Sequence, residues 1–354
     1  MKKDGKAEVQ HYVPKLLLRN FSFGNSDSPQ VHVFDKKEMR QFPASIDRIC
    51  GERRYNDLHV KDGIVSHEPL MTGIENLAAP LITRICIGES VSTLFEIERL
   101  SISLFVGSLF MRPRLMREEV KAAAGHIERL AKEILAQKIG SNATLQSAVD
   151  AASIDNLDDF AKEVTLELHA ENAKDFAEII SQKEWIILRP TPGRSFVISD
   201  NPIAMTNHRN YSPYGNLGLT VPGVQMTLPL SPERALLMMC PTLLPEYQAM
   251  RDESAHLLEQ EKALRVLGVN QDIAALDASI ASRVMHHGII DEFFSTVNGS
   301  RELVMAPEGV DEFNLNQVKQ SYRFIIGNQS ELDIAERLVQ ATPSLRDGLR
   351  MRMG

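Results

Sequence analysis

Among the residues suited to acid–base or metal chemistry, we single out His11, Glu75 and Asp200. An imidazole titrates near neutral pH, so His11 could move a proton during a reaction. Carboxylate oxygens are common ligands of divalent cations, so Glu75 and Asp200 could hold such an ion. The residue types therefore predict catalytic roles for His11 and Asp200, and metal-binding roles for Glu75 and Asp200.

Four further polar residues are candidates for binding the substrate: Arg19, Asn20, Arg112 and Asn201. A guanidinium group can hold a phosphate or carboxylate in a bidentate fork, and an amide can orient the same ligand. The structural alternatives are an internal ion pair for Arg19, a helix cap for Asn20, and an Arg112 side chain that extends to solvent from a buried segment.

The catalytic and metal-binding candidates also have structural alternatives. His11 could anchor the N-terminus by a hydrogen bond to the backbone. Glu75 stands three residues after Thr72, which is the spacing of a helix capping box. Asp200 and Asn201 precede Pro202, a combination typical of tight turns.

If these residues converge on one cleft, their chemistry is that of a metal-dependent phosphoester hydrolase, acting on nucleic acid or cleaving nucleotides. The alternative is a non-catalytic binding or interaction protein, or a nucleotide-sensing module, in which the polar motifs are structural. A divalent cation is the cofactor that the hydrolase hypothesis requires. The sequence contains none of the glycine-rich phosphate loops GxxxxGK[ST] and GxGxxG, and no GxSxG motif for acyl transfer.

The elements that would position these side chains follow from the hydrophobic pattern. Pro14 begins a short helix after His11, and an apolar periodicity predicts a helix from Thr72 to Gly88 around Glu75. A long helical region from 93 to 138 contains Pro113, which should break or kink it. Asp200 follows a predicted strand at 194–198.

The remaining pattern predicts strands at 30–35 and 39–42, the second ended by Pro43, and a helical region at 153–182. Short apolar runs after residue 183 predict further strands. Asn270 is expected to cap a helix that Gly288 closes, and another helix is expected at 330–340.

This order predicts a helix-rich α+β fold with an N-terminal β-hairpin and a second sheet-forming block after residue 183, packed on a layer of long helices. We expect one domain over residues 1–354. Its parts are the hairpin segment 10–60, the helical middle 72–182, the sheet-rich block 183–290, and a C-terminal helical segment and tail 291–354.

The composition narrows the classes of function. The net charge is −8, which argues against a broadly basic nucleic-acid-binding surface, although nucleotide or nucleic-acid partners stay open. Three cysteines, far apart and in no CxxC pair, favour a reducing compartment, so the cytoplasm is expected. The apolar run 102–111 is about half of what a membrane helix needs, and no membrane role is predicted.

Several motifs together resemble one known family. They are HYVPKLLLRNF at residues 11–21, VHVFD at 31–35, Tyr55, the helix with Glu75, FMRP at 110–113, ISDNP at 198–202 and PLSP at 229–232. In this order they resemble the uncharacterised family called domain of unknown function 4238. The resemblance covers the chain from about residue 10 to residue 290. The resemblance implies a single architecture for this region and no particular reaction.

Overall fold

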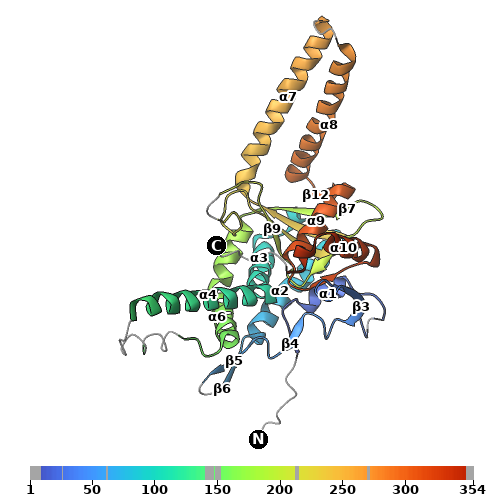
Figure 1. The fold of residues 1–354 in the computed structure, drawn as a ribbon. Helices are drawn as coiled ribbons and strands as arrows, with labels where there is room; N and C mark the ends of the chain where they lie inside the picture. The colour runs from blue at the N-terminus through green and yellow to red at the C-terminus, as the bar shows by residue number, and fades with distance from the viewer. Residues whose placement is uncertain are drawn as a thin grey trace.

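The computed structural model describes residues 9–25, 27–60, 63–139, 147, 153–211, 215–268 and 272–347, and shows the expected helix-rich α+β fold (Figure 1). The body combines two larger sheets with long helices, and a two-helix arm projects from it. The prediction of mixed α+β architecture is confirmed. The division into four segments of one domain stays a prediction.

The N-terminal segment folds back on itself through three short antiparallel pairings. The elements are β1 (Val9–His11), α1 (Lys15–Asn20), β2 (Gln30–Asp35), β3 (Arg40–Ser45), β4 (Gly51–Arg53), β5 (Asp57–Val60) and β6 (Gly63–Ser66). Strand β1 pairs with β4, β2 with β3, and β5 with β6. The expected hairpin is present, but Pro43 lies inside β3 instead of ending it. Because β3 is an edge strand, the missing proline N–H costs no ladder hydrogen bond there.

The hairpin belongs to a four-stranded sheet assembled from distant parts of the chain. Its order is β3-β2-β13-β8, where β8 is Ile198–Ser199 and β13 is Phe324–Ile326. Strand β13 pairs antiparallel with both β2 and β8. The N-terminal hairpin and the segment before Asp200 are thus joined by a C-terminal strand.

The expected strands after residue 183 are present, and most of them form a mixed five-stranded sheet that a strand beyond residue 290 completes. Its order is β12-β7-β11-β10-β9, with β7 at Glu184–Pro190, β9 at Ala204–Thr206, β10 at Gln225–Ser231, β11 at Arg234–Met239 and β12 at Glu302–Met305. Strand β12 is parallel to β7, and the other pairings are antiparallel.

Long helices pack beside these sheets. They are α2 (Glu68–Cys86), α3 (Glu96–Met111), α4 (Arg114–Ile139) and α6 (Leu157–Ser181), with a short 3-10 turn η1 at Val91–Thr93. Pro113 separates α3 from α4, which confirms the expected break. The apolar faces of α2 and α3 contribute Ile82, Ile85, Phe105 and Val106 to the main core, where they pack with Trp185 of β7.

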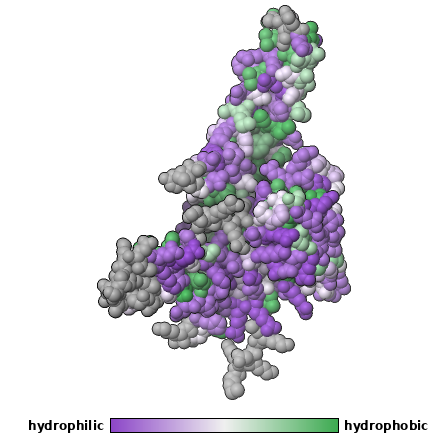
Figure 2. Space-filling view, viewed as in Figure 1, coloured by the Kyte–Doolittle hydropathy of each residue, from purple (hydrophilic) through white to green (hydrophobic). Residues whose placement is uncertain are grey.

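A helical hairpin, α7 (Leu244–Leu267) and α8 (Ile273–Asn298), forms the projecting arm. The sequence prediction was wrong at Gly288, because α8 continues through it to Asn298. The expected cap Asn270 lies outside the described residues, and Asp272 caps α8 by accepting a hydrogen bond from the Ala275 amide at 2.9 Å. Figure 2 shows hydrophobic side chains scattered over this arm, whereas the visible face of the body is mainly hydrophilic.

The remaining helical elements also belong to the body. They are η2 (Pro241–Leu243), α9 (Pro307–Gln320), α10 (Gln329–Ala341) and η3 (Pro343–Asp347). The main hydrophobic core includes Leu17 of α1, Val33 of β2, Ile82 of α2 and Met226 of β10, so it connects the hairpin, the helices and the larger sheet. Among the described helices, none has the length and apolar character to cross a membrane.

Candidate functional site

His11, the first of the predicted catalytic residues, is buried in β1. Its Nε2 lies 2.9 Å from the carbonyl oxygen of Ile46, and only 5% of the residue is exposed. Burial, helped by the nearby charge of Lys15, lowers the pKa of His11 from 6.5 to about 4. The ring is therefore neutral at pH 7, and its Nε2 donates to a backbone carbonyl, which is the anchoring arrangement.

Arg112 connects His11 with Glu75. Its Nη2 donates to the His11 carbonyl oxygen, and its Nη1 donates to Oε1 of Glu75 at 2.5 Å. Residue Arg112 is 5% exposed, and the Tyr55 hydroxyl donates to its carbonyl oxygen at 3.1 Å. The structure thus brings His11, Glu75 and Arg112 together, but through an internal ion pair and a backbone contact.

The capping box expected at Thr72 is absent from the described helix. Helix α2 already begins at Glu68, with His67 as its N-cap, so Thr72 and Glu75 lie inside it. Pro69 occupies one of the first helical positions, where its missing N–H is tolerated, and this explains the earlier start. Glu75 is free of any capping role and pairs with Arg112 instead.

Asp200 is fully buried and holds the chain before β13. Its Oδ1 accepts the Tyr322 amide at 2.8 Å, and its Oδ2 accepts the amides of Arg323 at 2.7 Å and Phe324 at 3.0 Å. Burial raises the pKa of Asp200 above its usual value, while the three amide donors oppose that shift. All the hydrogen bonds described for this carboxylate come from one short backbone segment.

The remaining predicted binding residues lie in separate places. The Asn201 Nδ2 donates to the Gln320 carbonyl oxygen at 2.9 Å, and the Asn20 Nδ2 donates to that of Leu230 at 2.8 Å. Arg19 is exposed in the last turn of α1. In the described part of the chain, no three His, Cys, Asp or Glu side chains gather as a metal site.

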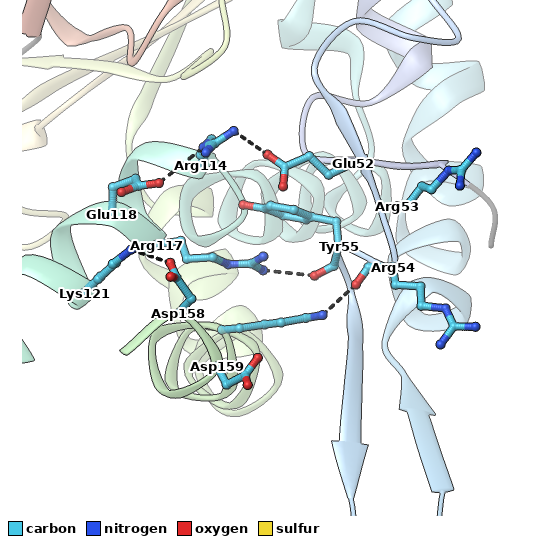
Figure 3. A pocket seen from close by; sticks show the side chains of 11 residues that line it. Glu52, Arg53, Arg54, Tyr55, Arg114, Arg117, Glu118, Lys121, Asp158 and Asp159 are labelled. Atoms are coloured by element: carbon cyan, nitrogen blue, oxygen red, sulfur yellow. Dashed lines mark hydrogen bonds and ion pairs between the residues drawn. The ribbon is translucent and has the colours of Figure 1, made fainter. Parts of the chain in front are cut away.

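A charged pocket that the sequence did not single out lies between the β4–β5 turn and the helices α4 and α6 (Figure 3). Its volume is about 260 Å³. The lining residues are Glu52, Arg53, Arg54, Tyr55, Arg114, Arg117, Glu118, Lys121, Asp158, Asp159 and Lys162. Figure 3 shows Arg53 and Arg54 pointing away from the helices, whereas Arg114, Arg117 and Lys121 reach from α4 toward the pocket.

Two of the cations at the pocket pair with carboxylates at its edge. Arg114 contacts Glu52 at 2.7 Å and Glu118 at 3.3 Å, and Lys121 contacts Asp158 at 2.6 Å. The exposed fractions of these side chains run from 33% for Glu118 to 71% for Asp158. Ion pairs with this exposure contribute about 0–1 kcal/mol each, so an incoming anion can replace them at little cost.

Two further cations, Arg117 and Lys162, donate to backbone carbonyls. Arg117 lies over the Tyr55 ring, 3.6 Å from its centroid, and its Nη2 donates to the Tyr55 carbonyl oxygen at 3.1 Å. The Lys162 Nζ donates to the Arg54 carbonyl oxygen at 2.6 Å. Burial lowers the pKa of both groups, and the charge of Arg117 lowers that of Lys162 further. These two positive charges are only partly compensated.

The family described as a protein of unknown function, DUF4238, matches residues 9–331 of this chain. The chain belongs to the DUF4238 family. This confirms the resemblance inferred from the motifs and extends it past residue 290 to include α9 and β13. Comparison with the curated proteins and with the solved structures gives no match.

The matched DUF4238 region contains the whole charged pocket, since its lining residues run from Glu52 to Lys162. A sequence signal for it exists in α4. Arg114, Arg117 and Lys121 are spaced three and four residues apart, which places them on one face of a helix. The opposing Arg53-Arg54-Tyr55 segment has no such periodicity, so its place across the pocket depends on the β1–β4 pairing.

Proposed function

We propose that this protein binds a small phosphate-bearing ligand, of the nucleotide class, in the charged pocket, and that it does so without cleaving it. The observation that carries the proposal is the position of Arg117 and Lys162, two partly buried cations at one pocket whose hydrogen bonds go to backbone carbonyls. A phosphate placed between them would add negative charge, which the nearby carboxylates supply only in part.

The pocket suits a small ligand. Its volume of about 260 Å³ is just below the roughly 300–1,000 Å³ found for small-molecule sites. Arg114 can add a second guanidinium fork, because its contacts to Glu52 and Glu118 are exposed ion pairs. The pocket residues thus support recognition of a phosphate group with a small organic part.

The alternative, a metal-dependent phosphoester hydrolase with His11, Glu75 and Asp200, has less support. Glu75 is paired with Arg112, and Asp200 is occupied by three backbone amides. His11 is buried and hydrogen-bonded to Ile46. A cation at these residues would require each of them to give up its present partner, which favours the binding function.

Calorimetric titration of the full chain with inorganic phosphate, a nucleoside monophosphate, a nucleoside triphosphate and a short oligonucleotide tests the proposal. We expect saturable binding of a mononucleotide, weakened at least about tenfold by Arg117→Met and by Lys162→Met, since each removes one charge-assisted contact. Arg189→Met is the matched control, because Arg189 is exposed and pairs with Glu302 away from the pocket.

No binding by the wild-type chain, or equal binding by the Lys162→Met variant, would overturn the proposal. The same samples incubated with Mg²⁺ or Mn²⁺ distinguish the two functions. The hydrolase would be supported instead if the wild-type chain forms product and both Asp200→Asn and His11→Asn abolish it while staying folded. Preference for the oligonucleotide would move the ligand class to nucleic acid.

A further inference from the structure

A small cavity adjoins the charged pocket, and Tyr55 and Arg117 line both. Its other lining residues are Asn56, Met71, Met111, Arg112, Thr165, Leu166 and His169. The volume is about 10 Å³, at the lower end of the roughly 10–15 Å³ that one water molecule needs on this measure.

Four buried polar atoms on this lining have no hydrogen-bond partner within the described residues: Asn56 Oδ1, Arg112 Nε, Arg117 Nε and His169 Nδ1. Asn56 is fully buried, His169 is 1% exposed and Arg112 is 5% exposed. A buried polar group left unpaired costs about 1–3 kcal/mol, so four at one cavity would be a large penalty. Their common location indicates a bound molecule that satisfies all four.

The donor and acceptor roles of three of these atoms follow from their other contacts. Each guanidinium Nε carries a hydrogen and can only donate. The Asn56 Nδ2 donates to Oε2 of Glu68 at 2.6 Å, and a carboxylate only accepts, so the amide is oriented with Oδ1 toward the cavity as an acceptor.

The fourth atom is His169 Nδ1, and its role depends on which ring nitrogen carries the proton. Its Nε2 lies 2.6 Å from the Ser108 hydroxyl oxygen, and burial lowers its pKa to about 4, so the ring is neutral. With the ring proton on Nε2, Nδ1 is an acceptor. The cavity then presents two donors and two acceptors.

We propose that this cavity is a binding site for one ordered water molecule, which accepts from Arg112 and Arg117 and donates to Asn56 and His169. A water molecule has this complement of two donors and two acceptors. A monatomic anion such as a halide would meet the two guanidinium groups but would be repelled by the Asn56 Oδ1 and the His169 Nδ1.

The water site fixes Arg117 from the inner side, while the Tyr55 carbonyl fixes it from the pocket side. It also joins Arg117 to Arg112, which holds the His11 carbonyl. The motif HYVPKLLLRNF, which begins at His11, is thereby linked to the pocket wall through one chain of hydrogen bonds.

Two substitutions at one position separate the water contact from the Ser108 contact. The amide of His169→Asn can reach the place of Nδ1 and keep an acceptor there, whereas His169→Gln reaches toward Ser108 and leaves no group at the cavity. We expect crystals of the wild-type chain and of His169→Asn to show the water, and crystals of His169→Gln to lack it. Ser103→Ala is the control, since Ser103 Oγ is buried without a partner but does not line this cavity.

Nitrogen-15 NMR of the wild-type chain at neutral pH gives an independent reading in solution. We expect the tautomer with the proton on Nε2 for His169. Crystals grown in sodium bromide test the competing occupant by anomalous scattering. A bromide peak between Arg112 and Arg117, a cavity without density in the wild-type chain, or a proton on His169 Nδ1 would overturn the proposal.

Discussion

At the scale of single residues, Gln10, His11 and Tyr12 anchor the N-terminal strand to the body. Gln10 accepts the Asn56 amide at 2.6 Å and donates to Asp57 at 2.7 Å, and the Tyr12 amide donates to the Cys50 carbonyl at 3.0 Å. His11 adds the contacts to Ile46 and Arg112. The sequence left open whether His11 meets a ligand or anchors the N-terminus, because residue type alone does not reveal whether a polar side chain contacts a ligand or a backbone group.

Replacing Arg112 by lysine should destabilise the protein by about 3 kcal/mol. A lysine ammonium is a point donor that cannot span both Glu75 and the His11 carbonyl, so a buried charge loses part of its compensation. Urea unfolding of the wild type and Arg112→Lys measures this. Arg189→Lys, at an exposed ion pair, should change the stability by less than about 1 kcal/mol. Equal stability of Arg112→Lys and wild type would contradict the stabilising role of the contacts from Arg112 to Glu75 and to the His11 carbonyl.

Asp200→Asn should cost about 2–3 kcal/mol of stability, although the two side chains have nearly the same shape. The asparagine NH₂ must face at least one of the three amides that now donate to the carboxylate, which leaves that amide unpaired. Thermal unfolding is the measurement, and Asp47→Asn, at an exposed pair with Lys15, is the control. A fully stable Asp200→Asn variant would show that the amide contacts contribute little.

At the scale of elements, side-chain amides of α9 accept backbone N–H groups that a neighbouring strand would otherwise pair. Asn314, Gln317 and Gln320 accept the amides of Val197, Ser199 and Met205, at 3.0, 3.2 and 2.9 Å. They are spaced three residues apart, so one helix face satisfies the segments before and after Asp200. This role has no recognisable sequence pattern, because the same residues would serve equally well on an exposed helix face.

Gln317→Met tests this arrangement. Gln317 is fully buried, its Oε1 accepts from the Ser199 amide, and its Nε2 donates to the Pro202 carbonyl at 2.9 Å. Methionine preserves the shape but leaves both backbone groups unpaired, so we expect a loss of about 2–4 kcal/mol in urea unfolding. Gln329→Met, at an exposed position of α10, should stay within about 0.5 kcal/mol of wild type. A similar small effect for Gln317→Met would refute the strand-replacing role of α9.

The hydrophobic pattern identified the elements with strong periodicity and missed those that depend on distant pairing. The β2–β3 hairpin, the break at Pro113 and the strands β7, β10 and β11 follow from local residue types. Strand β13 has three residues and exists because β2 and β8 flank it. The charged pocket also depends on distant parts of the chain. One wall comes from β4–β5 and the other from α4 and α6, and no local sequence signal predicts that these elements lie together.

At the scale of the whole molecule, two buried neutral histidines predict an acid-sensitive fold. His11 and His169 both have a pKa of about 4 in the folded chain, below the usual 6.5. Between these values the unfolded chain takes up protons that the folded chain does not. The contribution of the two histidines to the free energy of unfolding is therefore complete above about pH 6.5. It is lost progressively as the pH falls toward 4.

The free energy of unfolding should fall by about 1–2 kcal/mol for each of the two histidines from about pH 7 to about pH 5. Burial raises the pKa of Asp200, so that carboxyl acts in the opposite sense, and a comparison of variants is needed to isolate the histidines. His169→Gln should be less stable than wild type at neutral pH but should lose less stability on acidification, because one of the two proton-binding groups is gone. Gln329→Met, at an exposed position of α10, should leave the pH dependence unchanged, because it changes no titratable group. Urea unfolding across this range measures all three chains, and parallel curves for wild type and His169→Gln would show that His169 is protonated without cost in the folded protein.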